Sequence, residues 1–150
     1  MKLQFNSKPF VLILVSIAML ATITQLTSCG KSDPAPSAQE QVKAKLTSAL
    51  WKIQSVMVDG VDKTSLYTGL TLQFTATAYN STNGKPVWPT SGTWSFTSTD
   101  ATTIKRDDGI EITVAATDSS LTLTLNWPTT TLGGGRAASV KGVNVFTFVK

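Results

Sequence analysis

The chain has 150 residues and a formal net charge of +4, with 13 basic and 9 acidic side chains, no histidine and one cysteine. This length suits one ordinary domain. The lack of histidine excludes His-based triads, His general bases and most catalytic zinc sites, and a single cysteine excludes an internal disulfide. The basic residues are scattered along the chain rather than clustered, so we expect no nucleic-acid partner.

The first thirty residues have the layout of a secretory signal peptide. Lys2 and Lys8 flank the start of an apolar run over residues 9–23, which is shorter than the roughly 20 residues that a membrane-spanning helix needs. The alternative is an N-terminal membrane anchor that stays on the protein.

The segment Leu26-Thr27-Ser28-Cys29 resembles the bacterial lipobox, with Leu at the third place before Cys and small residues between them. The resemblance implies that residues 1–28 are a lipoprotein signal peptide and that Cys29 is lipidated. Several acyl chains on one cysteine anchor a protein stably, which a single chain does not. Gly30, rather than Asp, follows Cys29, and this favours the outer membrane, at its periplasmic face or the cell surface. The alternative is an incidental cysteine in an ordinary signal peptide.

Residues 29–45 are predicted to be the lipidated cysteine and a flexible linker, because the stretch "GKSDPAPSAQEQ" is rich in proline and small polar residues. A short plug helix of one or two turns is expected within residues 42–50. Val42, Leu46 and Ala49 would share one face of this helix.

From Leu50 onward, apolar residues alternate with polar ones, which is typical of antiparallel strands with one buried face. Charged residues are 15% of the chain against about 25% in soluble domains, and the threonines that take their place favour strands. On the first strand one face is expected to carry Trp51, Ile53, Ser55 and Met57. Further strands are expected over residues 70–79, 92–98, 102–106, 110–116, 121–127 and 143–150.

Turn residues separate several of these runs, at Asp59-Gly60, Asn83-Gly84 and Asp108-Gly109. Many short strands joined by such turns indicate a sandwich or a barrel, and the second half of the chain shows no helical period.

The pattern over residues 46–150 resembles the lipocalin-like lipoprotein domains of the Bacteroidetes group. The markers are Trp51 on the first strand, Gly92-Thr93-Trp94 on a middle strand and the Leu-rich strand 121–125. The resemblance implies a small up-and-down antiparallel β-barrel of about 7–8 strands, of the lipocalin or calycin type. Such first strands often carry Gly where this chain has Ala49, and the Arg that usually covers the Trp has no counterpart on a late strand, since Arg136 lies in a Gly-rich loop.

The four tryptophans are the candidate ligand-binding residues. Trp51, Trp94 and Trp127 are expected to point into the barrel, as core residues or as the aromatic lining of a ligand cavity. Trp88 lies on a loop between two prolines, where an exposed indole could stack on a sugar or anchor a partner protein. The preferred interpretation of Trp88 is nevertheless a hydrophobic lid over the barrel mouth.

Three other motifs are considered and set aside. The charged cluster of residues 105–111 contains Asp107 and Glu111, which could be paired carboxylates of a glycosidase, but a solvated hairpin turn is the preferred interpretation. The stretch Asp59–Asp62 has too few oxygen ligands for a calcium loop, and residues 133–136 lack the Lys-Ser/Thr of a phosphate loop.

The resulting hypothesis is an exported, lipid-anchored envelope protein with a non-enzymatic binding domain. We expect a monomer without cofactor or metal, which binds a small apolar ligand inside the barrel or a glycan or protein at its rim. The alternative is a structural component of an envelope complex with a filled barrel, and a hydrolase is a distant third because no nucleophile and base are visible.

Overall fold

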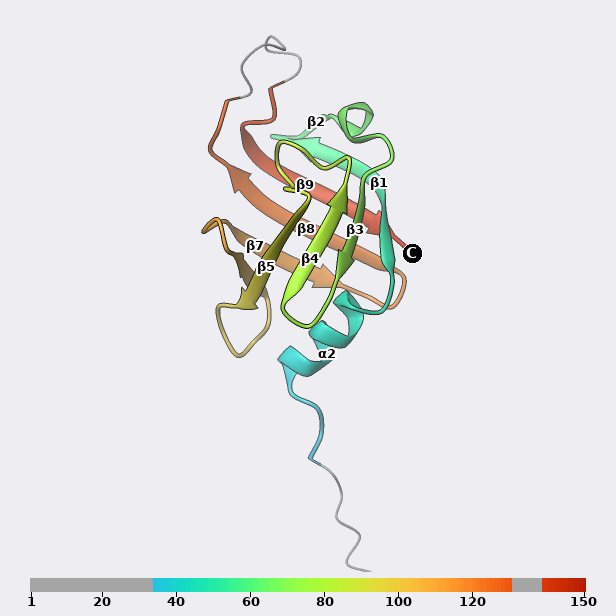
Figure 1. The fold of residues 1–150 in the computed structure, drawn as a ribbon, viewed down its shortest axis with the longest axis vertical. Helices are drawn as coiled ribbons and strands as arrows, with labels where there is room; N and C mark the ends of the chain where they lie inside the picture. The colour runs from blue at the N-terminus through green and yellow to red at the C-terminus, as the bar shows by residue number, and fades with distance from the viewer. Residues whose placement is uncertain (1–33, 131–138) are drawn as a thin grey trace, which may run out of the picture. The chain divides into compact units, whose positions relative to one another are not determined.

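Eight antiparallel strands close into an up-and-down barrel, in a computed structural model that describes residues 34–130 and 139–150 (Figure 1). Neighbours in sequence are neighbours in the sheet, and the last strand pairs with the first to close it. The barrel strands are β1 Leu50–Val58, β3 Thr71–Phe74, β4 Ala78–Thr82, β5 Ser91–Phe96, β6 Thr103–Arg106, β7 Glu111–Ala116, β8 Ser120–Trp127 and β9 Gly142–Val149. The predicted all-β barrel is confirmed.

A ninth strand and a short helical turn lie beside the barrel. Strand β2, Val61–Asp62, folds back on the end of β1 through a tight turn in which Asp59 and Gly60 both have positive φ. The 3-10 helix η1, Thr64–Tyr67, follows it and leads into β3. Two backbone hydrogen bonds hold this segment against the edge of β1 that β3 leaves free. The Ile53 amide donates to the Leu70 carbonyl, and the Lys63 amide donates to the Val56 carbonyl.

The register of β1 differs from the expected one. A bulge between Ile53 and Ser55 inserts one residue into the ladder with β9. Because the side-chain period of a strand is two, the extra residue moves the buried face from Ser55 and Met57 to Val56 and Val58.

The run over residues 70–79 is not one strand but the hairpin of β3 and β4. Thr75 closes the turn, because its hydroxyl accepts from the Ala78 amide at 3.1 Å while its own amide donates to the Ala78 carbonyl at 2.8 Å. Ala76 and Thr77 at the tip are exposed. A threonine that replaces a backbone partner can turn a chain without glycine or proline, which strand periodicity cannot reveal.

The helix before the barrel, α2 Ala38–Leu46, begins earlier than expected and takes in part of the predicted linker. Ser37 caps it in a capping box: the Ser37 hydroxyl accepts from the Glu40 amide at 3.2 Å, and the Glu40 carboxylate accepts from the Ser37 amide at 2.7 Å. Leu46 is fully buried at its end. The folded unit therefore spans residues 36–150.

The barrel interior is packed with side chains. One continuous cluster of buried apolar residues runs through it, and the large members from different strands are at most 5% exposed, including Trp51, Phe74, Trp94 and Leu123. Edge-to-face ring contacts join Phe74 to Trp94 and Trp94 to Phe96.

Candidate functional site

The two ends of the barrel are built differently. At one end, α2 lies against the turns that follow β5 and β7: Gln39 Nε2 donates to the Ser98 carbonyl at 2.9 Å and Lys45 Nζ to the Ala116 carbonyl at 3.5 Å. We call this the α2 end. The opposite end carries η1 and the loop of residues 83–90 between β4 and β5, and we call it the groove end (Figure 1).

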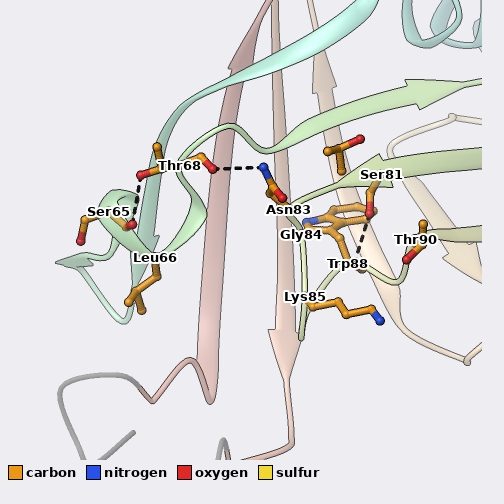
Figure 2. Close-up of a pocket in the computed structure, with 10 residues that line it drawn as sticks. Ser65, Leu66, Thr68, Ser81, Asn83, Gly84, Lys85, Trp88 and Thr90 are labelled. Atoms are coloured by element: carbon orange, nitrogen blue, oxygen red, sulfur yellow. Dashed lines mark hydrogen bonds between the residues drawn. The ribbon is translucent and has the colours of Figure 1, made fainter.

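A groove of about 670 Å³ opens between η1 and the 83–90 loop. Ser65, Leu66 and Thr68 form one wall, and the end of β4 with the loop forms the other (Figure 2). Asn83 bridges the walls, since its Nδ2 lies 3.5 Å from the carbonyl oxygens of Thr68 and Gly69. The lining is mostly hydroxyl and amide groups with one cation and no carboxylate.

Several polar side chains of the groove are available to a ligand. Within the described part of the chain, no hydrogen bond or ion pair engages the side chains of Ser65, Thr82, Lys85 and Thr90. Ser81 is different, because its hydroxyl donates to the carbonyls of Trp88 and Pro89 and so holds the loop. The groove thus has fixed walls and free donors and acceptors, as binding sites do.

Trp88 lies in the wall of this groove but is fully buried. The loop winds back over it: the Trp88 amide donates to the Gly84 carbonyl at 2.8 Å, and a Cβ on Gly84 would lie 2.5 Å from that of Trp88. This burial agrees with the preferred interpretation of Trp88, a hydrophobic lid at the barrel mouth, and not with an exposed indole. The flanking prolines marked the loop correctly but not the direction of its side chain.

Arg106 holds Trp88 from within the barrel. Its guanidinium carbon lies 5.0 Å from the centre of the Trp88 ring, and its Nη1 donates to the Val87 carbonyl at 2.8 Å. The other edge of the guanidinium pairs with Asp108, through Nη2 to Oδ2 and through Nε to Oδ1 at 3.2 Å. The side chain of Arg106 is fully buried, so the expected solvated turn is wrong at this residue.

The position of Arg106 on its strand could have predicted that its side chain is buried. Arg106 follows Ile104 by two residues and pairs with Trp94 on β5, and both of these residues point inward. The rest of the cluster is solvated as expected: Lys105 and Glu111 form an exposed ion pair at 3.9 Å. Asp107 accepts from the Thr93 amide at 3.1 Å, and Glu111 is engaged by Lys105.

The pKa of Asp108 reflects this ion pair. Partial burial acts to raise it, but the hydrogen bond from Arg106 and the backbone hydrogen bond from Ile110 outweigh burial and leave it lowered. The carboxylate therefore stays charged and keeps the buried guanidinium neutralised.

The other predicted tryptophans do not line the groove. Trp51 and Trp94 are buried at the α2 end; the indole of Trp51 donates to the Leu46 carbonyl at 2.8 Å, and that of Trp94 donates to the carbonyls of Thr75 and Ala78. Trp127 is half-buried at the end of β8. A cation does cover the first-strand Trp51, but it is Lys150, whose Nζ lies 5.7 Å from the ring centre.

Some predicted sites cannot be placed. Cys29, residues 1–28 and the Gly-rich residues 133–136 with Arg136 lie outside the described residues. Where the chain is described, no three acidic, histidine or cysteine side chains gather as a metal site, and Asp59 and Asp62 accept from the backbone amides of Val143 and Thr64. No helix among residues 34–130 and 139–150 is long and apolar enough to cross a membrane.

Comparison with known proteins found no family model, no curated protein and no solved structure that matches the chain.

Proposed function

We propose that this protein is a lipid-anchored component of the cell envelope whose barrel is a non-enzymatic binding module. The groove between η1 and the 83–90 loop is its binding site, for a glycan or a polar segment of a partner protein. The observation that carries this proposal is the set of unengaged hydroxyl groups around the groove, together with Lys85. Such groups can satisfy the hydroxyls and amides of a sugar chain or a peptide.

The packed interior supports a site at the rim rather than in the middle of the barrel. A lipocalin-type apolar ligand needs an internal cavity of at least about 300 Å³. Trp51, Phe74, Trp94 and Leu123, whose burial would exclude such a cavity, all pack into the continuous core. This packing favours the groove at the rim over the middle of the barrel as the site of a ligand.

The anchor part of the proposal rests on the lipobox-like segment before Cys29 and on Gly30, which favours the outer membrane. The replacement Cys29→Ser should abolish the incorporation of a radioactive fatty acid by cells that express the protein. Labelling that persists in this variant would remove the anchor from the proposal.

The binding part is tested on a glycan array and on immobilised envelope proteins from the host. Lys85→Ala and Thr90→Ala should each weaken retention about fivefold or more, because each removes a group that can bond to the ligand without a structural role of its own. Gln41→Ala, in a smaller groove near α2, is the matched control and should bind as the parent does. Equal binding by all variants would reject the groove as the site.

The packed barrel also supports a second candidate, a structural component of an envelope complex without a ligand. In that case, crosslinking in cells should capture one envelope protein in constant proportion, while the array shows no retention by the parent protein.

A further inference from the structure

Beneath the groove, several buried polar atoms have no hydrogen-bond partner. They are the indole nitrogen of Trp88, the phenolic oxygens of Tyr67 and Tyr79, and the amide oxygen of Asn144. Each of these residues is at most 1% exposed. Buried polar groups are nearly always paired, so a group of unpaired ones in one region calls for an explanation.

These residues belong to one aromatic layer. Ring centres lie 5.1 Å apart for Tyr67 and Phe146, 5.9 Å for Phe146 and Trp88, and 5.7 Å for Trp88 and Tyr79, each edge to face. Asn144 precedes Phe146 by two residues on β9 and so points to the same side. Its Nδ2 donates to the carbonyls of Val140 and Gly142, which fixes the amide and leaves Oδ1 as the unpaired atom.

The layer begins directly at the groove. Trp88 lines the groove, and Tyr67 lies on η1 between Leu66 and Thr68, which line it too. Figure 2 shows the Trp88 ring close to Gly84 and Ser81 in the groove wall. The Trp88 ring therefore lines the polar groove and also contacts the aromatic layer that carries the unpaired groups.

We propose that these atoms form the inner wall of a subsite that opens when the Trp88 side chain leaves its buried position, for a neutral polyhydroxyl ligand such as a terminal sugar ring. The inference rests on the proposed function and specifies its ligand class. The unpaired atoms are an indole donor, an amide acceptor and two phenols that can do either, and none carries a charge at neutral pH. The buried charge nearby, Arg106, is already neutralised by Asp108, so no charged ligand is called for.

The α2 end provides the internal comparison. Its two buried indoles, Trp51 and Trp94, both donate to backbone carbonyls. Burial of aromatic polar groups without partners is therefore not general in this barrel. Among the described residues the only other unpaired buried side-chain atom is Nε1 of Trp127, also toward the groove end.

The test follows the four indole N–H signals in a nitrogen–proton correlation spectrum, each assigned by a Trp→Phe variant. The probes are methyl glucoside, methyl galactoside and N-acetylglucosamine, with sodium sulfate as a charged comparison. At least one sugar should shift the signal of Trp88 while those of Trp51 and Trp94 stay in place. A spectrum in which no sugar moves the Trp88 signal overturns the inference.

Tyr67→Phe separates a ligand contact from a structural one. Removal of a hydroxyl that has no protein partner should leave the melting temperature unchanged or raise it, and should weaken sugar affinity about tenfold if that hydroxyl bonds to the ligand. A lower melting temperature with unchanged affinity would mean that the hydroxyl is structural, and the inference would fail.

The outcomes distinguish this inference from the proposed function. If Lys85→Ala and Thr90→Ala weaken binding but Tyr67→Phe does not, the groove is the site and the inner subsite is rejected. If a sugar shifts Trp88 while those two rim variants bind as the parent does, the subsite stands and the rim proposal is rejected.

Discussion

The two ends of this eight-stranded barrel are closed by different structures. At the α2 end a capped helix buries Leu46, and the two large indoles beneath it each find a backbone carbonyl. At the groove end a loop folds a tryptophan inward over a buried arginine and leaves its indole nitrogen unpaired.

The difference shows which end of the barrel contains features that lower the stability of the fold. Unpaired polar groups and a buried charge lower stability, and proteins keep such features where function requires them. At the α2 end both buried indoles are paired, whereas at the groove end buried polar atoms of Trp88, Tyr67 and Asn144 are not. The comparison therefore supports the proposal that the groove end is the binding end of the barrel.

The largest expected effect is at the groove end, in the support of Trp88. Asp108→Ala leaves the buried guanidinium of Arg106 without its counter-charge, and we expect a loss of about 2 kcal/mol in the free energy of unfolding, measured in urea. The larger loss of stability that follows the breaking of a fully buried ion pair is not expected here, because the Asp108 side chain is 35% exposed. Glu111→Ala, which removes the exposed partner of Lys105, should cost less than about 1 kcal/mol.

The same pair has a predictable pH dependence. The pKa of Asp108 is lowered in the folded protein, so the unfolded chain binds the proton first and the stability from this group is lost as pH falls through the folded value. The deficit of Asp108→Ala relative to the parent should therefore be full at neutral pH and shrink in acid. A deficit that is constant down to acid pH would show that the carboxylate is not what neutralises Arg106.

A smaller effect should separate the indoles of the two ends. Trp51→Phe and Trp88→Phe remove the same volume, but only the first leaves a buried carbonyl, that of Leu46, without its donor. We expect Trp51→Phe to be more destabilising than Trp88→Phe by about 1 kcal/mol in urea. Equal losses would mean that the Trp88 indole is hydrogen-bonded in solution, and the contrast between the ends would disappear.

The helix at the α2 end should respond to the loss of its cap. Ser37→Ala removes the hydroxyl that accepts from the Glu40 amide, and caps of this kind contribute about 1 kcal/mol. Faster amide exchange should appear in α2 and not in the 83–90 loop. Exchange that rises at both ends would show that the barrel opens as one unit.

Strand alternation predicted most of the barrel, because the burial of one face imposes a period of two wherever the ladder is regular. It was wrong where a bulge after Ile53 and a side-chain turn at Thr75 interrupt the ladder. Neither interruption involves glycine or proline, the residues from which turns are usually predicted. The bulge depends on pairing with the distant strand β9, whereas the turn depends on the local hydrogen bonds between Thr75 and Ala78.

The candidate site was less predictable for a related reason. The prolines around Trp88 predicted a loop, but the direction of the indole depends on Arg106, a residue of a different strand that lies over its ring in the closed barrel. Unpaired atoms such as Asn144 Oδ1 are a property of the folded environment as a whole. Residue type alone does not distinguish a buried polar atom with a partner from one without.

The smallest effect expected is spectroscopic and concerns how well the groove end is sealed. Burial raises the pKa of Tyr67 from 10.0 to about 12. The pKa of Tyr79, the other tyrosine of the chain, is also raised, chiefly by burial. In Tyr79→Phe, the tyrosinate absorbance of the folded protein should therefore appear near pH 12, and near pH 10 in denaturant. Between these values the folded state holds the proton that the unfolded chain has lost, so stability should fall as pH rises.

A midpoint near 10 in the folded protein would mean that water reaches the Tyr67 hydroxyl freely. The groove end would then be open to solvent rather than closed by Trp88.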